Sequence, residues 1–271
     1  DLREKAAGEQ VVQGVDEVYH LSANMGGIGF ITAVHADVAR DNILMDTNML
    51  EAAHQAGVKR FFYSSSACVY PRFLQQSPDV TPLKESDALP AEPEDGYGWE
   101  KLMAEQMCRY YHEEHGLETR VARFHNVFGT MGTYSGGREK APAAICRKVA
   151  LAKDGDEIEV WGDGQQTRSF MYIEDCVEGI WRITQGYSHY PLNLGTDRLI
   201  SISALVDLIA QIAGKRLFKR FDLSKPQGVR GRNSDNTLLR QLLGWLPSIP
   251  LEVGLERTYR WISEQIGEGA Q

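Results

Sequence analysis

The sequence predicts an α/β protein built on a Rossmann-like parallel sheet. Through its first half, short apolar runs alternate with longer segments that carry apolar residues at helical spacing. Strands that alternate with helices of this length form βαβ units, and such units produce a parallel sheet. Hydrophobic residues make up 42% of the 271 residues, which is enough for one sizeable core or two unequal ones.

The amino-terminal half begins with an expected strand, loop and helix. Residues 15–21 form a short apolar run that predicts a buried strand, and the glycines within residues 26–29 predict a loop. Apolar residues then recur at helical spacing from about residue 36 to residue 56. Gly57 is expected to close this helix, because glycine readily adopts the left-handed conformation found at helix ends.

A second strand, loop and helix follow, and then a third strand. Residues 60–64 predict a strand, and the proline- and acid-rich residues 71–93 predict a long surface loop. Residues 97–115 predict a helix closed by Gly116, and residues 119–124 predict the third strand. Ligands of such sheets bind outside the carboxyl ends of the strands. Three segments are therefore expected to converge on one crevice: residues 21–23, 64–68 and 124–126.

After about residue 130 the pattern changes to short strands and helices separated by loops that contain glycine and proline. The expected strands are residues 158–161, 169–173 and 191–194. The expected helices are residues 141–153, 174–185, 203–213 and 251–266. We therefore predict two parts, residues 1–130 and residues 131–271, with the second forming a smaller α/β lobe over the crevice and returning some segments to the sheet.

Bulk properties exclude several classes of protein. The formal net charge of −8 argues against a nucleic-acid partner or an anionic membrane, and no apolar run reaches the roughly 20 residues of a membrane span. The cysteines form no CxxC pair, which argues against a metal site and a disulfide scaffold and predicts a cytoplasmic location. The chain opens with Asp1, and the residues that follow are no signal peptide.

Tyr97, Lys101 and Ser66 form the first candidate catalytic group. Tyr97 and Lys101 are four residues apart and share one helix face, where an ammonium is expected to lower the pKa of the phenol. Ser66, at the end of a predicted strand, can hydrogen-bond the same substrate oxygen. This trio can remove a proton from an alcohol while a nicotinamide takes the hydride. The alternative interpretation is a surface pair on a helix.

Cys68 and Lys140 are a second candidate pair. Cys68 follows Ser66 by two residues, just past the strand end, and Lys140 lies in a glycine-rich loop before a predicted helix. A thiol and an amine on opposite faces of a sugar can remove and return carbon-bound protons. The alternatives are that Cys68 is a small buried apolar residue and that Lys140 binds an anion.

Basic residues gather in the second half of this acidic chain. Arg168 and Arg232 lie in glycine-flanked loops, where a guanidinium group suits bidentate binding of a diphosphate. We expect at least two of this group to contact a phosphorylated ligand: Arg138, Arg147, Lys148, Arg168, Arg230 and Arg232. The glycines of residues 26–29 do not fit the dinucleotide fingerprint and predict a close approach of backbone to substrate instead.

Five segments together resemble the extended short-chain dehydrogenase/reductase family, and within it the enzymes that epimerise GDP-mannose at carbons 3 and 5. They are residues 24–30, 65–71, 123–126, 136–144 and 231–236, and the resemblance runs along nearly the whole chain. It implies that Tyr97 and Lys101 take the 4-hydroxyl proton while NAD takes the hydride. It also implies that Cys68 and Lys140 then invert the neighbouring carbons, that Ser66 binds the reacting oxygen, and that GDP-L-galactose or GDP-L-gulose results.

The same resemblance implies two sets of binding residues and a homodimer formed through residues 36–56 and 97–115. The implied GDP-mannose contacts are Gly26, Ser66, Ala67, Cys68, Asn126, Glu139, Lys140, Lys148, Gln166, Arg168 and Arg232. The implied NAD contacts are Asp1, Leu2, Leu21, Ala23, Tyr97, Lys101 and Phe124. By this resemblance residues 1–130 are the NAD-binding region and residues 131–271 are mainly a substrate-binding lobe.

The chain departs from the family at its start. Family members open with a strand, a glycine-rich phosphate turn and a helix, whereas this sequence starts after all three. We therefore expect a fragment of a longer protein that binds NAD weakly, because the helix amides that seat a pyrophosphate are missing. Two alternatives are kept: a GDP-fucose synthase-type epimerase/reductase, which residues 136–144 disfavour, and a non-catalytic sugar-nucleotide-binding fragment.

Overall fold

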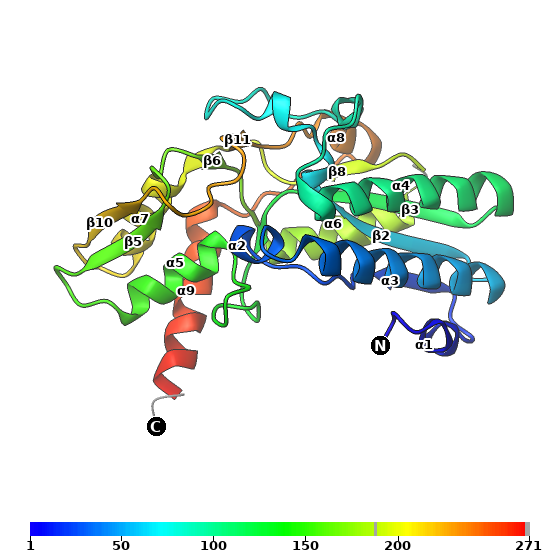
Figure 1. Cartoon of the computed structure of the whole chain (residues 1–271), viewed down its shortest axis with the longest axis horizontal. Helices are drawn as coiled ribbons and strands as arrows, with labels where there is room; N and C mark the ends of the chain where they lie inside the picture. The colour runs from blue at the N-terminus through cyan, green and yellow to red at the C-terminus, as the bar shows by residue number, and fades with distance from the viewer. Residues whose placement is uncertain (187–188, 269–271) are drawn as a thin grey trace.

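The computed structural model describes residues 1–186 and 189–268, and it confirms the predicted α/β fold with a parallel sheet. Four parallel strands lie in the order β1-β2-β3-β8, with β1 pairing at the edge through Glu17 and Arg60 (Figure 1). Their bounds are β1 (Glu17–His20), β2 (Arg60–Ser66), β3 (Glu118–Phe124) and β8 (Leu192–Leu194). The last strand comes from the second half of the chain, so the sheet is completed by a returning segment.

Helices cover both faces of this sheet, because alternate residues of a strand point to opposite sides. On one face Phe61 and Tyr63 of β2 pack with α3 (His35–Gln55) and α4 (Asp95–His115). On the other face Phe62 packs against α6 (Ile173–Gln185) and α8 (Thr237–Leu243). The predicted glycine endings hold, since Gly57 and Gly116 have φ of 70° and 71° just beyond α3 and α4.

Two connections of the first half differ from their predictions. The expected loop at residues 26–29 turns directly into a short helix, α2 (Ile28–Ile31), which begins at Gly27 as its N-cap. Residues 71–93 contain no strand or α-helix, but they are more than a surface loop because Val80, Leu83 and Ala88 are buried. Short helical turns shape this region: η1 (Ala67–Val69), η2 (Arg72–Leu74) and η3 (Glu85–Ala88). No helix was predicted for residues 5–11, where the structure has α1 (Lys5–Val11) packed against α3.

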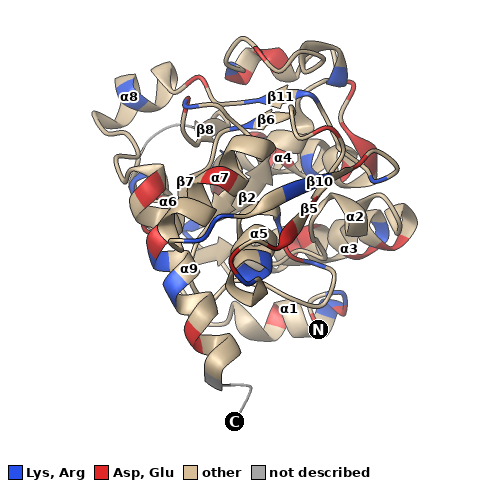
Figure 2. Ribbon diagram, turned by 90° about the vertical axis from the view of Figure 1, so that its left-hand side faces the viewer, with Lys and Arg blue, Asp and Glu red and all other residues tan. Residues whose placement is uncertain are grey.

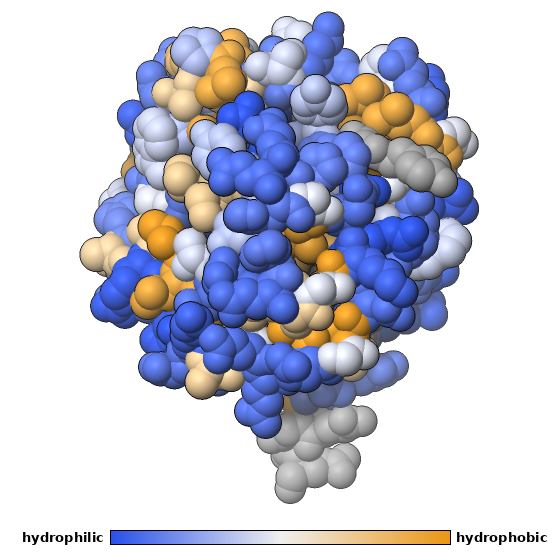
Figure 3. Space-filling model, turned by 90° about the vertical axis from the view of Figure 1, so that its right-hand side faces the viewer, coloured by the Kyte–Doolittle hydropathy of each residue, from blue (hydrophilic) through white to orange (hydrophobic). Residues whose placement is uncertain are grey.

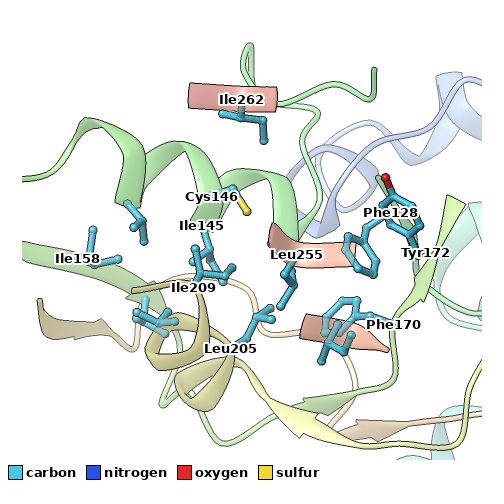
Figure 4. Close-up of a cluster of buried hydrophobic side chains, with 14 residues drawn as sticks. Phe128, Ile145, Cys146, Ile158, Phe170, Tyr172, Leu205, Ile209, Leu255 and Ile262 are labelled. Carbon is cyan, nitrogen blue, oxygen red and sulfur yellow. The ribbon is translucent and has the colours of Figure 1, made fainter. Parts of the chain in front are cut away.

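The second lobe is held by its own apolar core. Helices α5 (Ala141–Leu151), α7 (Ile202–Ile212) and α9 (Leu251–Glu268) meet there beside β5 (Glu157–Trp161). Figure 4 shows Leu205, Ile209, Leu255 and Ile262 directed into this cluster from their helices. The strand β10 (Phe218–Asp222), which pairs in parallel with β5, was not predicted. Its polar, half-exposed residues carry no apolar run.

The predicted strand at residues 169–173 is shorter in the structure, which has a second, unpredicted strand in another sheet just before it. The unpredicted strand, β6 (Thr167–Arg168), lies between β11 (Gly231–Arg232) and β9 (Ile200–Ser201). The shortened strand, β7 (Met171–Tyr172), pairs with β4 (Val127–Phe128), which directly follows the end of β3. These short pairings bring the arginine-bearing strands of the second lobe over the carboxyl edge of the main sheet.

Candidate functional site

The carboxyl end of β2 carries the first site residues. Ser66 is the last residue of the strand, and its Oγ accepts a hydrogen bond of 3.2 Å from the backbone N–H of Cys68. That bond caps η1, so Ala67 is buried while Cys68 stays partly accessible. The strand end therefore fixes the backbone beneath the thiol and leaves the thiol itself at the crevice.

Helix α4 is locked against this turn through Gly98. A Cβ atom at position 98 would lie 2.3 Å from the carbonyl oxygen of Cys68, so only glycine allows the approach. The backbone N–H of Glu94 donates to the same carbonyl over 3.4 Å. Tyr97 precedes Gly98 and is almost fully buried, so the structure brings Ser66, Cys68 and Tyr97 together as predicted.

The pKa of Tyr97 differs from the expectation. Burial raises it well above its usual range, the charges of Cys68 and Glu100 raise it further, and a hydrogen bond with Ser66 lowers it. The ammonium of Lys101 lies over the phenol ring, 5.7 Å from its centroid, and donates a 3.0 Å hydrogen bond to the hydroxyl of Tyr63. The prediction that Lys101 makes Tyr97 more acidic is wrong for this state, because desolvation outweighs the distant ammonium.

Lys140 faces the same space from the second lobe. It is the N-cap of α5, and its loop is braced by Gly27, whose N–H donates to Arg138 over 3.0 Å. A Cβ on Gly27 would lie 2.4 Å from the carbonyl oxygen of Glu139, so the close backbone contact of the glycine loop is with this chain. Surrounding protein lowers the pKa of Lys140 although solvent still reaches its side chain, and Cys68 acts in the opposite direction.

Arg232 lies against the thiol. One guanidinium nitrogen is 3.4 Å from Sγ of Cys68, and another donates to Glu94 over 3.1 Å. Its Nε donates to Gln75 Oε1 over 2.5 Å, so all sides of this buried group are paired. Burial opposes a charge here, but Cys68 and Glu94 raise the pKa of Arg232 above its usual value. The structure therefore places a permanent positive charge beside the sulfur.

Arg168 on β6 pairs with Arg232 on β11. Figure 2 shows these two strands beside each other. The guanidinium of Arg168 donates only to backbone carbonyls, those of Thr167 at 2.8 Å and Gln227 at 3.4 Å, among the residues that the structure describes. Burial, followed by the charge of Arg232, lowers its pKa to about 10. Two adjacent guanidinium groups with one carboxylate, Glu94, leave a site suited to an anion.

The other predicted substrate residues are held by nearby protein groups. Lys148 donates to the carbonyl of Glu159 over 2.9 Å, and the backbone N–H of Gly137 donates to Glu139 over 2.7 Å. Asn126 has φ of 45° and donates to Ser169 over 2.9 Å, whereas Gly26 is buried against Phe30. Gln166 keeps a buried Oε1 with no partner within the described chain, so this acceptor remains for a ligand donor.

The predicted cofactor residues divide into two groups. Leu21, which is 52% exposed, and Ala23 follow β1, and Phe124 ends β3 with its ring stacked on Phe62. Asp1 instead forms an ion pair with Arg3, and Leu2 packs with the α3 side of the core. Lys101 is fully buried and donates to Tyr63, whereas Leu21 presents exposed apolar surface just beyond β1, which would suit a flat cofactor ring such as that of NAD.

Sequence analysis missed the groups packed behind Lys101 and Cys68. Asp46, Glu100 and His20 are buried next to Lys101, and Gln75 and Glu94 hold Arg232. The one usable signal was Glu100 itself, a charged residue directly before Lys101 on a helix expected to face the sheet. Gln75 and Glu94 also line a pocket of about 520 Å³ that opens between α2 and residues 226–230.

Two features lie away from this crevice. His112, Glu118 and His189 could hold a metal ion by distance, but Arg120 already contacts Glu118 at 2.9 Å and His189 at 3.1 Å. A resident guanidinium disfavours a cation there. Figure 3 shows that the end of the molecule away from the second lobe is largely hydrophilic, with scattered apolar patches. Within the described residues, no helix is both long enough and apolar enough to span a membrane.

Known proteins resemble the chain along most of its length. A model of the NAD-dependent epimerase/dehydratase family matches residues 1–195. The GDP-mannose 3,5-epimerase of Arabidopsis thaliana is 48% identical over 266 residues, covering 98% of this chain and 70% of that relative. The GDP-L-fucose synthase of Escherichia coli (strain K12) is 29% identical over 265 residues, covering 92% of this chain and 81% of that relative. The structure of UDP-glucose 4-epimerase from Thermotoga maritima with UDP-glucose matches with a TM-score of 0.88 at 24% identity, covering 98% and 84% of the two chains.

Proposed function

Because the chain belongs to the NAD-dependent epimerase/dehydratase family, and within it to the GDP-mannose 3,5-epimerases, we propose that it epimerises GDP-mannose at carbons 3 and 5. The protein is accordingly an isomerase that uses NAD without net consumption. The observation that carries the proposal is the grouping of Tyr97, Ser66, Cys68 and Lys140 at one crevice, in a chain 48% identical to a GDP-mannose 3,5-epimerase.

The first step is oxidation of the mannosyl 4-hydroxyl. Bound NAD supplies the hydride acceptor and a positively charged ring, which favours the phenolate of Tyr97 against the burial that disfavours it. Tyr97 takes the hydroxyl proton, and Ser66, hydrogen-bonded to Tyr97, orients the same oxygen. Lys101, whose ammonium lies 5.7 Å from the centroid of the Tyr97 ring, would hold Tyr97 in place for this step. The resulting ketone acidifies the hydrogens on carbons 3 and 5.

Cys68 and Lys140 then exchange those carbon-bound protons. The guanidinium of Arg232, 3.4 Å from Sγ, holds the sulfur of Cys68 in place at the crevice. Lys140 reaches the same space from the start of α5, and its amine can take and return a proton there. Arg168, with Lys148 and Gln166 nearby in the lobe, would hold the GDP portion.

The alternatives are less well supported. A GDP-fucose synthase-type reaction rests on relatives at 29% identity, against 48% for the epimerase. A binding module without chemistry would not need a thiol, a lysine and a tyrosine at one strand end. We further propose a cytoplasmic homodimer formed through α3 and α4, whose outer residues Ile43, Leu44, Trp99 and Met103 are exposed apolar side chains.

Isotope exchange tests this function directly. Protein, NAD and GDP-mannose are incubated in deuterated water without reductant, and deuterium at carbons 3 and 5 is followed by NMR. We expect Cys68→Ser to lose carbon exchange and keep its GDP-mannose affinity, because serine is far less acidic than cysteine. Cys146→Ala, in the core of the second lobe, is the matched control and should keep exchange. Wild-type exchange in Cys68→Ser would remove Cys68 from the mechanism, and exchange that requires NADPH would favour the reductase.

A further inference from the structure

A buried cluster of ionisable groups lies behind Lys101, on the side away from the crevice. Asp46 comes from α3, Glu100 and Lys101 from α4, and His20 and Tyr63 from β1 and β2. All five residues are at most 2% exposed. The ammonium of Lys101 is 3.9 Å from a carboxylate oxygen of Asp46 and also 3.9 Å from one of Glu100. Two carboxyl groups therefore share one ammonium in a space closed to water.

The hydrogen bonds assign the negative charge to Asp46. Its Oδ1 lies 2.8 Å from His20 Nε2, and its Oδ2 accepts a 2.7 Å hydrogen bond from the Tyr63 hydroxyl. Both oxygens are thus paired, as a buried carboxylate requires. Although burial opposes ionisation, the charge of Lys101 and these hydrogen bonds lower the pKa of Asp46.

Only one of the two carboxyl oxygens of Glu100 has a hydrogen-bond partner among the described residues. Its Oε1 accepts a 2.7 Å hydrogen bond from Asn42 Nδ2, but its Oε2 has no partner among the described residues. An ionised carboxylate with one bare, buried oxygen is far more costly than a neutral acid in the same place. With Asp46 ionised, a neutral Glu100 also leaves a single carboxylate charge facing the ammonium of Lys101.

We propose that Glu100 is a neutral, protonated acid in the resting protein and acts as a positioning residue for Tyr97 and Lys101. This rests on the proposed role of Tyr97 as the base for the 4-hydroxyl. While Glu100 is neutral, Lys101 balances Asp46 alone and the space near Tyr97 carries no surplus negative charge. When Glu100 loses its proton, the added charge disfavours the phenolate of Tyr97.

The electrostatics agree with this geometry. Burial raises the pKa of Glu100 to about 8, Lys101 opposes the rise, and the charge of Asp46 adds to it. Negative charge on Glu100 in turn raises the pKa of Tyr97. The groups facing Glu100 are therefore Asn42 and Asp46 from α3, Lys101 and Tyr97 from α4, and Tyr63 from β2. The rate of 4-hydroxyl oxidation should fall as the pH rises through about 8, against the usual gain from ionising a phenol.

The test is Glu100→Gln, whose amide has the shape of the neutral acid. The rate of carbon exchange is measured from pH 6 to pH 10, with Glu113→Gln, an exposed residue of the same helix, as the matched control. The ratio of the Glu100→Gln rate to the rates of wild type and the control should be near one at pH 7 and should rise by up to about tenfold per pH unit above the ionisation of Glu100. A hundredfold loss at pH 7 in a folded Glu100→Gln protein, or an unchanged alkaline limb, would overturn the proposal.

A second readout does not depend on turnover. Infrared spectroscopy of the wild-type protein should show the carbonyl stretch of a protonated carboxyl group at pH 7 that disappears as the pH rises through about 8. Glu100→Gln should lack this band, and Glu113→Gln should keep it. Presence of the band with no exchange of GDP-mannose would refute the proposed function and leave the protonation of Glu100 intact. Absence of the band in wild type would refute the protonation itself.

Discussion

His125 offers a measurable link between burial and stability. It is fully buried directly after β3, with Nε2 2.9 Å from Oδ1 of Asn193, and its Nδ1 has no partner in the described chain. Burial lowers its pKa from 6.5 to about 3, and the charges of Arg232 and Arg123 act in the same direction. The folded protein therefore keeps this imidazole neutral at pH values where the unfolded chain binds a proton.

The sign and size follow from proton linkage. Above pH 6.5 neither state binds the proton, so the stability owed to a neutral His125 is fully present. Below that pH the unfolded state binds a proton at His125 but the folded state does not. The free energy of unfolding therefore falls by about 1.4 kcal/mol per pH unit. At pH 5.0 the loss is about 2 kcal/mol, and it continues until the folded pKa of about 3 is reached.

Urea unfolding of wild type and His125→Gln at pH 7.5 and pH 5.0 measures this loss. The glutamine amide can donate to Asn193 but does not titrate, so the gap between the two proteins should shift by about 2 kcal/mol in favour of the variant at pH 5.0. Glu100 acts with the opposite sign, because its raised pKa removes stability as the pH rises from 4.5 to about 8. Its effect is common to both proteins and cancels in the gap. Parallel stability profiles would refute a neutral His125.

Three further outcomes follow from contacts described above. Gly27→Ala should displace the loop of Lys140, because the added methyl group meets the carbonyl of Glu139. We expect carbon exchange to fall at least tenfold while GDP-mannose affinity is less affected. Unchanged exchange would contradict this contact. Leu205→Ala in the second-lobe core should cost about 2–5 kcal/mol of unfolding free energy in urea, and a cost below 1 kcal/mol would show a loosely packed site. Met103→Glu should turn the proposed dimer into a monomer in sedimentation velocity, with Arg109→Glu on the same helix as a charge control; an unchanged mass would exclude this face.

The parts of the fold that sequence predicts well are those set by local physics. Gly57 and Gly116 closed their helices because a left-handed residue is needed there. The aromatic run of β2 marked a central strand because both faces of this strand are covered. By contrast, β10 pairs through its backbone and exposes Phe218, so neither alternation nor an apolar run revealed it. The strand predicted at residues 169–173 was reduced to β7, and β6 just before it was missed, because the two short strands have different partners that only tertiary structure decides.

The candidate site follows the same division. Ser66, Cys68 and Tyr97 could be grouped from sequence because strand ends in a parallel sheet must converge. The pKa of Tyr97 could not, because it depends on how completely α4 is buried and on the charge of Glu100. The contact of Arg232 with Cys68 joins residues 164 positions apart, and that of Asn42 with Glu100 joins residues 58 apart. No spacing rule encodes such pairs.

The junction between Gly98 and the Cys68 carbonyl sets a fixed interval inside the crevice. In the roles proposed here, Tyr97 begins the reaction and Cys68 inverts a neighbouring carbon, and this contact holds the backbones that carry both residues together. A hexose ring can then react at two neighbouring carbons without being released or rotated, because the two side chains that act on those carbons are themselves neighbours. The same contact limits how substrate specificity can change. A shift of α4 that makes room for a differently shaped sugar would move Tyr97 and also disturb the backbone of Cys68.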